Sequence, residues 1–162
     1  MSFMDPRLWS GKVFVGGWID GGAGVLPVRE PATGSQLAEI GVASEEDVDR
    51  AAQQAAIAQR DWARLNPEDR AAVLRRAGDL WEKHAEEIQS WLVREGGSIP
   101  PKAALETHIA ANECYEAAAL PSHPHGEVLT SNENRWSFAR RLPAGVVSVI
   151  APFNFPLVLS IR

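Results

Sequence analysis

The feature that most constrains the fold is an apolar run near residue 150 that leads into a turn bounded by two prolines. Residues 146–151 are apolar or small, and residues 152–156 place one Asn between Pro152 and Pro156. A short run without polar alternation is typical of a strand buried on both faces of a parallel sheet. The pattern therefore predicts an α/β fold in which residues 146–151 form a sheet strand and a helix starts at Leu157.

The turn after this predicted strand carries a single carboxamide, that of Asn154. Open α/β sheets bind ligands at the carboxyl ends of their strands, and the two prolines restrict the backbone on either side. A carboxamide N–H₂ is a neutral donor that can stabilise a developing oxyanion in acyl-transfer chemistry. The alternative is that Asn154 satisfies its own turn, as Asn side chains often do. Position alone leaves both interpretations open.

The rest of the chain predicts short strands and long helices. Residues 1–10 have no periodic pattern, whereas residues 12–20, 25–29 and 35–42 have the composition of short strands separated by turns that contain Gly or Pro. Residues 135–142 alternate between apolar and polar side chains, which predicts an exposed strand with one apolar face.

Three helical regions lie between these strands. Ser44 stands before three acidic residues, an arrangement that resembles a capping box at a helix start. Asn66, followed by a proline, predicts the start of a second helix, whose apolar period continues to residue 92 with a break near His84. A third helical region, rich in Ala, begins at Pro100.

Composition excludes several classes of function. The chain has 162 residues, of which 45% are hydrophobic and 23% charged, as in one folded domain. A net charge of −5 argues against a dedicated nucleic-acid or anionic-membrane binder. One cysteine excludes an internal disulfide and fits a reducing cytoplasm, and no apolar run is long enough to span a membrane. The four histidines have no ligand-like spacing, so no metal site is expected.

Five segments, taken in chain order, resemble the N-terminal third of the aldehyde dehydrogenase superfamily. Three departures from the family pattern stand out: Glu30 stands where Asn is usual, Phe153 stands where Trp is commoner, and residues 157–162 replace the usual continuation. Residues 95–103 and 153–162 are similar to the benzaldehyde and vanillin dehydrogenase branch. The five segments are residues 14–20, 31–34, 44–51, 62–74 and 143–156.

The resemblance implies oxidation of an aromatic, benzaldehyde-like aldehyde to the carboxylic acid with NAD or NADP, through a thiohemiacetal and a thioester. It assigns Asn154 as a catalytic donor to the oxyanion. The positions that match the lining of the dinucleotide site are Ile150, Ala151, Pro152 and Phe153. The positions that match the substrate tunnel are Phe155, Leu159 and Arg162.

The resemblance also implies an organisation of the chain. Residues 1–122 would be the N-terminal part of the NAD(P)-binding domain, residues 123–144 a strand arm of the oligomerisation domain of a dimer or tetramer, and residues 145–162 the truncated first strand of the dinucleotide-binding sheet. The family's nucleophilic Cys and general-base Glu match no residue here, and Cys114 is not that Cys. We therefore expect a cytoplasmic homo-oligomer in the complete enzyme and an inactive fragment alone. The alternative is a non-catalytic assembly or interaction module.

Overall fold

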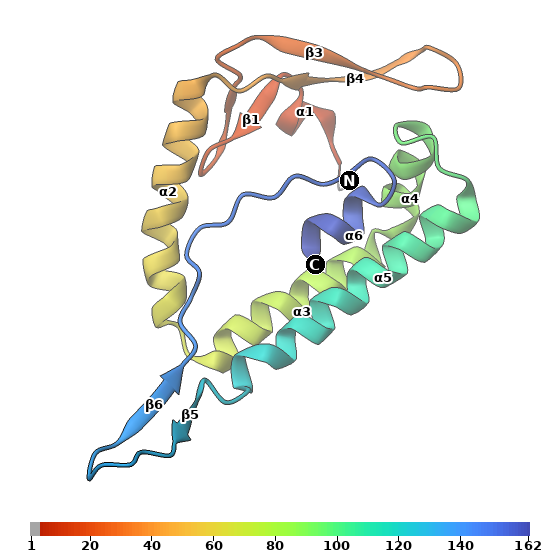
Figure 1. The fold of residues 1–162 in the computed structure, drawn as a ribbon. Helices are drawn as coiled ribbons and strands as arrows, with labels where there is room; N and C mark the ends of the chain where they lie inside the picture. The colour runs from red at the N-terminus through yellow and green to blue at the C-terminus, as the bar shows by residue number, and fades with distance from the viewer. Residues whose placement is uncertain (1–3) are drawn as a thin grey trace.

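The computed structural model describes residues 4–162, in which short antiparallel strands accompany a group of helices (Figure 1). In chain order the elements are α1 (Pro6–Trp9), β1 (Lys12–Phe14), β2 (Trp18–Asp20), β3 (Val25–Arg29), β4 (Gln36–Gly41), α2 (Glu45–Arg64), α3 (Pro67–Lys83), α4 (Ala85–Arg94), α5 (Pro100–Ala119), the 3₁₀ turn η1 (Leu120–Ser122), β5 (Gly126–Leu129), β6 (Ser137–Arg140) and α6 (Pro156–Ile161).

Local capping sets the starts of α2 and α3, as the sequence predicts. The Ser44 hydroxyl accepts from the backbone N–H of Asp47 at 3.2 Å, and the Asp47 carboxylate accepts from the backbone N–H of Ser44 at 3.0 Å. Asn66 caps α3 by accepting from the backbone N–H of Asp69 at 2.9 Å. The predicted break near His84 is confirmed, because α3 ends at Lys83 and α4 begins at Ala85.

Helix α5 lies at the centre of the packing and contacts α3, α4 and α6. Its buried face consists mainly of small residues, which allows neighbouring helices to approach closely. Near its start, Ala103 packs with Ile88 and Leu92 of α4, and Leu157 of α6 lies against this group. The buried residues of α5 are Ala103, Glu106, Thr107, Ala110, Ala111, Cys114 and Ala118.

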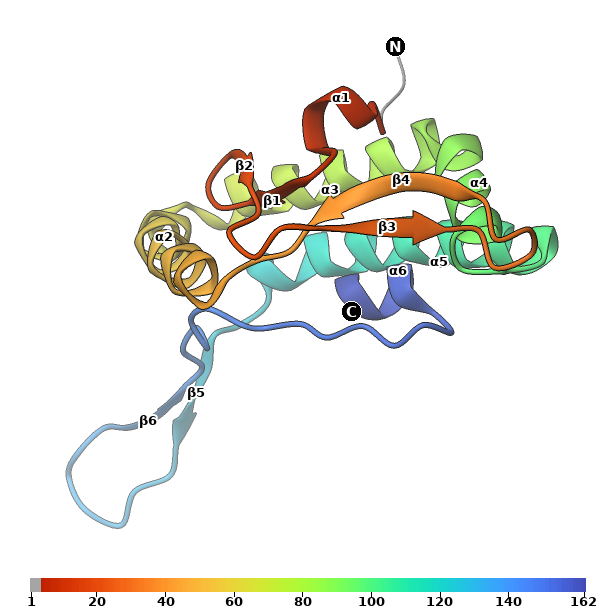
Figure 2. The ribbon, with the colours of Figure 1, turned by 90° about the horizontal axis from the view of Figure 1, so that it is seen from above.

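Within residues 4–162 the strands form three separate two-stranded antiparallel sheets, β1–β2, β3–β4 and β5–β6. The β5–β6 hairpin projects away from the helices (Figure 2). The exposed strand predicted over residues 135–142 is confirmed in part, since β6 covers Ser137–Arg140. Its partner β5 and the short helix α1 were not predicted, because neither has a periodic pattern long enough to detect.

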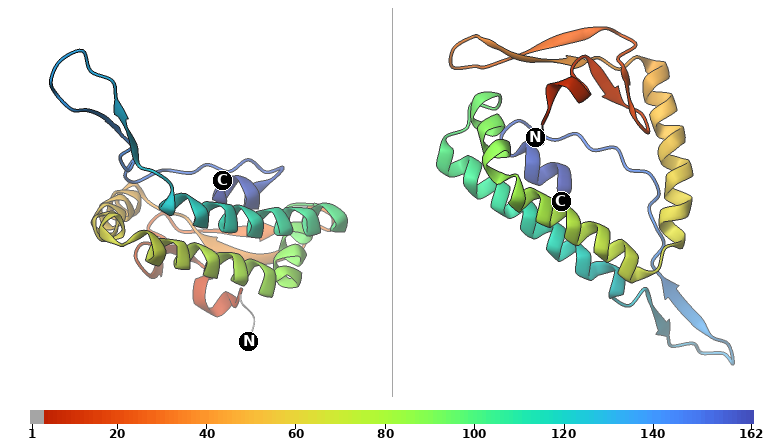
Figure 3. Two further views of the ribbon diagram at one scale, coloured as in Figure 1. Left: turned by 90° about the horizontal axis from the view of Figure 1, so that it is seen from below. Right: turned by 180° about the vertical axis from the view of Figure 1, so that it is seen from behind.

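Residues 146–151, predicted as a buried parallel strand, form no strand ladder among residues 4–162. The segment is extended and crosses the space between α2 and α6 without a strand partner in residues 4–162 (Figure 3). Val147, Val149 and Ile150 are exposed. A strand exists only when a neighbouring strand satisfies its backbone groups, and the described residues supply no such neighbour. None of the helices over residues 4–162 combines the length and apolar character needed to cross a bilayer.

Candidate functional site

Asn154 lies in an exposed turn between the extended segment and α6. Among residues 4–162, no group forms a hydrogen bond with its side chain. The interpretation in which Asn154 only satisfies its own turn therefore has no support in this structure. The carboxamide is open to a ligand, and its direction depends on how the backbone of the turn is held.

A buried carboxylate from another helix holds the end of this turn. The backbone N–H of Leu157, at the start of α6, donates to Oε1 of Glu106 at 2.8 Å. Glu106 belongs to α5 and is 0% exposed, and its Oε2 accepts from the ammonium of Lys102. Glu106 was not predicted from the sequence. The signal that could have found it is an acidic residue on the otherwise small and apolar face of α5.

The same lysine also contacts the aromatic residue of the turn. The Lys102 ammonium lies 4.6 Å from the centroid of the Phe155 ring, a cation–π arrangement. Phe155 is half-buried, so one ring face is engaged by this lysine. Lys102 thus links the Glu106 carboxylate to the residue that follows Asn154.

The two remaining predicted substrate positions lie on α6 or just after it. Leu159 is partly exposed, whereas its neighbour Val158 is buried against the helices. The Arg162 guanidinium pairs with the Glu113 carboxylate of α5, with Nε at 2.8 Å from Oε1. Glu113 raises the pKa of Arg162 further above its usual value, first through this hydrogen bond and then through its charge.

The four predicted dinucleotide positions form the exposed end of the extended segment. Ile150 is 93% and Phe153 is 89% exposed, and Ala151 and Pro152 lie between them. This apolar, solvent-facing strip fits the flat ring of a nicotinamide or adenine better than it fits a phosphate. Phe153 also lines a cavity of about 490 Å³ with Trp81 and Trp91 and with residues of α6, but Asn154 does not line it.

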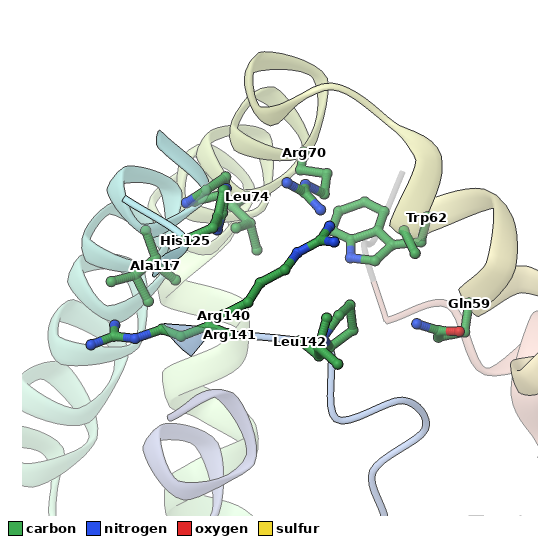
Figure 4. A pocket seen from close by; sticks show the side chains of 13 residues that line it. Gln59, Trp62, Arg70, Leu74, Ala117, His125, Arg140, Arg141 and Leu142 are labelled. Atoms are coloured by element: carbon green, nitrogen blue, oxygen red, sulfur yellow. The ribbon is translucent and has the colours of Figure 1, made fainter. Parts of the chain in front are cut away.

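A second cavity, of about 560 Å³, lies at the other end of α3, near the base of the β5–β6 hairpin. Arg140 reaches across it toward Trp62, and Arg70 approaches from α3 (Figure 4). The Arg70 Nε is buried and has no hydrogen-bond partner in residues 4–162. None of the predicted site residues lines this cavity.

The cysteine of the chain is not placed for nucleophilic chemistry. Cys114 is 4% exposed on the buried face of α5. Burial raises the pKa of its thiol, and a nucleophilic cysteine needs the opposite shift. In the described part of the chain, no group of three or more His, Cys, Asp or Glu side chains is placed to hold a metal ion.

Comparisons with known proteins give a consistent result. The sequence profile described as the aldehyde dehydrogenase family matches residues 18–162. The chain is 60% identical to a vanillin dehydrogenase of Amycolatopsis sp. over 162 residues, which is 100% of this chain and 33% of that protein. It is 42% identical over 159 residues to a benzaldehyde dehydrogenase (NAD(+)) of Pseudomonas putida, covering 98% of this chain and 33% of that protein.

One solved structure is similar to this chain in both fold and sequence. The crystal structure of an NAD-dependent benzaldehyde dehydrogenase from Corynebacterium glutamicum matches with a TM-score of 0.89 and 37% identity, over 99% of this chain and 35% of that chain. The chain spans about a third of the length of the curated relatives it matches. The resemblance drawn from the five sequence segments is thereby confirmed at the level of family and branch.

Proposed function

The chain belongs to the aldehyde dehydrogenase family, and on this premise we propose that residues 1–162 are part of an enzyme that oxidises an aromatic aldehyde to its carboxylic acid with NAD or NADP. The observation that carries the proposal is the exposed carboxamide of Asn154, which has no hydrogen bond among residues 4–162, on a turn anchored by the buried Glu106. Similarity to vanillin and benzaldehyde dehydrogenases supports the aromatic substrate class.

In this proposal Asn154 acts on the carbonyl oxygen of the aldehyde. Its N–H₂ group donates to the oxygen as a nucleophile attacks the carbonyl carbon, so that the negative charge develops against a fixed dipole. One such donor contributes about 2.7–4 kcal/mol of transition-state stabilisation. The ring of Phe155, one residue further on, supplies an aromatic surface close to that oxygen, and Leu159 and Arg162 extend the same side of the site along α6.

Residues 150–153 would hold the dinucleotide through their exposed apolar surface. NAD or NADP, when bound, accepts the hydride that leaves the aldehyde carbon. Because Cys114 is buried, the proposal places the nucleophilic cysteine of the thiohemiacetal and thioester, and the general-base Glu, outside these 162 residues. We therefore expect residues 1–162 alone to be inactive.

The test is an Asn154→Ala substitution in the full-length protein that contains this chain. With benzaldehyde or vanillin and NAD or NADP, we expect kcat to fall by about 10²–10³, the usual effect of removing one oxyanion donor. Asn132→Ala, an exposed Asn between β5 and β6, is the matched control and should leave turnover unchanged. Unchanged turnover in Asn154→Ala would remove Asn154 from the mechanism.

A second candidate function is a non-catalytic assembly module. It is favoured by the β5–β6 hairpin, in which Trp136 is 79% exposed and its ring stacks on Phe138 with centroids 6.1 Å apart. Exposed aromatic side chains on a projecting strand pair are suited to contact with another subunit. The two candidates are compatible if the hairpin joins the subunits of a homo-oligomeric dehydrogenase. They are distinguished by the oligomeric state of residues 1–162 in solution.

A further inference from the structure

From the contacts around the turn we infer that Glu106 is a positioning residue for Asn154. Glu106 holds the first free N–H of α6 and thereby fixes the turn that presents the carboxamide. The inference rests on the proposed function of Asn154 as an oxyanion donor. It adds a fully buried residue that lies 48 positions earlier in the chain and is none of the proposed substrate or cofactor positions.

The burial of the Glu106 carboxylate needs a physical explanation. An ionised carboxylate placed in a helix–helix contact costs free energy unless its oxygens are paired, and an apolar side chain of similar volume usually serves stability as well or better. Both Glu106 oxygens are paired, one with the backbone N–H of Leu157 at 2.8 Å and the other with the Lys102 ammonium. The first contact joins α5 to the turn and is the one that a purely apolar packing would lose.

Helix α6 cannot cap its own start. Pro156 at its first position has no N–H, so the Leu157 N–H is the first donor that needs an acceptor. Phe155, which precedes the helix, has no side-chain oxygen to accept it, and no local side-chain cap forms. Glu106 supplies the missing acceptor from a helix 51 residues away in sequence.

The same cluster restrains each residue between Asn154 and this hydrogen bond. Phe155 lies under the Lys102 ammonium at 4.6 Å, and Pro156 has a fixed backbone dihedral. The Asn154 side chain has no hydrogen bond of its own among residues 4–162, so its direction depends on the backbone. An oxyanion donor must stay within about 0.5 Å of its productive position.

The first experiment compares Glu106→Ala and Glu106→Gln in the full-length protein. We expect Glu106→Ala to lower kcat about 10- to 100-fold with little change in KM for the aldehyde, because a displacement of about 1 Å costs up to about 10²-fold in rate. Glu106→Gln should recover most of this loss, since its amide oxygen can still accept from Leu157. Glu116→Ala, an exposed Glu on the same helix, is the control and should behave like the wild type.

A double-mutant cycle separates positioning from a general loss of structure. If Glu106 acts through Asn154, Glu106→Ala should cause no further loss of kcat when added to Asn154→Ala. Losses that multiply would contradict the inference while leaving the role of Asn154 intact. Normal turnover in Asn154→Ala alone would instead remove the proposed function, so the two failures are distinguishable.

Hydrogen–deuterium exchange gives a readout that does not require activity. We expect peptides covering residues 153–161 to exchange faster in Glu106→Ala than in the wild type, and Glu106→Gln to restore protection. Peptides from the β3–β4 hairpin should be unchanged in all three proteins. Equal exchange of residues 153–161 in Glu106→Ala and the wild type would overturn the inference whatever the kinetics show.

Discussion

Asp47 is a single carboxylate that joins the start of α2 to the turn between β2 and β3. It accepts from the backbone N–H of Gly22 at 2.8 Å and from that of Ser44 at 3.0 Å, and it pairs with Arg50. A Cβ at residue 22 would lie 2.8 Å from the Asp47 carboxylate, so the contact requires glycine there. These donors, led by the Ser44 and Gly22 backbone N–H groups, lower the pKa of Asp47 from 3.8 to about 2.

The lowered pKa of Asp47 predicts a specific pH dependence of stability. Because the folded state favours the carboxylate, its contribution is fully present above about pH 4 and is lost as the pH falls toward 2. We expect Asp47→Asn to lower the Tm at pH 7 and to flatten the fall in Tm between pH 4 and pH 2. Thermal unfolding followed by circular dichroism checks this.

The matched control is Asp49→Asn, an exposed aspartate of the same helix. Asp49→Asn should show the same dependence of Tm on pH as the wild type, and its Tm should differ little from the wild-type value at each pH. If the Tm curves of Asp47→Asn and the wild type run parallel from pH 7 to pH 2, the carboxylate does not make the contribution assigned to it.

At the scale of residues, what could be predicted depended on how far apart the partners are in sequence. Ser44 and Asn66 were predicted as caps because each bonds a backbone N–H three residues away. Asn154 was assigned as a donor by the family resemblance, because its position between two prolines left two interpretations open. Glu106 was not predicted, because its partner Leu157 is 51 residues away and no local pattern records such a contact.

At the scale of elements, α3 and α5 pack closely against each other at Gly78. A Cβ at residue 78 would lie 2.6 Å from Cε1 of Tyr115. The Tyr115 hydroxyl in turn donates to Asp79 at 2.9 Å, which holds the ring in place. The absence of a side chain at Gly78 therefore allows α3 and α5 to approach each other this closely.

Gly78→Ala should destabilise the protein although Ala is the better helix former. Overpacking costs about 1–3 kcal/mol and the gain in helix propensity returns up to about 1 kcal/mol, so we expect a net loss of about 1–2 kcal/mol. Urea denaturation of the full-length protein measures it. In a Tyr115→Ala background the clash is absent, and Gly78→Ala should then be neutral or stabilising. A loss of equal size in both backgrounds would contradict the packing argument.

Helices and strands differed in how well sequence predicted them. The helices after Ser44, Asn66 and Pro100 begin where predicted, because a helix satisfies its own backbone and local caps mark its ends. Residues 146–151 have strand composition but form no ladder among residues 4–162. A strand depends on a neighbour that its own sequence does not specify, so composition alone could not decide its state.

At the scale of the whole molecule, two apolar surfaces are exposed. One is the extended segment, where Val147, Ile150 and Phe153 are exposed, and the other is the projecting hairpin with Trp136 and Phe138. Apolar surface of this extent is unusual on a protein that works alone and unpartnered. If the dehydrogenase proposal holds, a sheet and a dinucleotide cover the first surface. If the chain is an assembly module, another subunit covers the second surface.

The two surfaces give opposite predictions for residues 1–162 expressed alone. If the extended segment belongs to a sheet, the isolated chain should form large, polydisperse aggregates, because an unpaired apolar segment is a template for pairing with other chains. Val147→Lys with Ile150→Lys should then reduce aggregation, whereas Trp136→Lys should have little effect. Size-exclusion chromatography with multi-angle light scattering measures the mass in each case. A discrete oligomer that Trp136→Lys dissociates, and that the double substitution leaves intact, would instead favour the assembly module, because the hairpin would then be sufficient for a closed and specific contact.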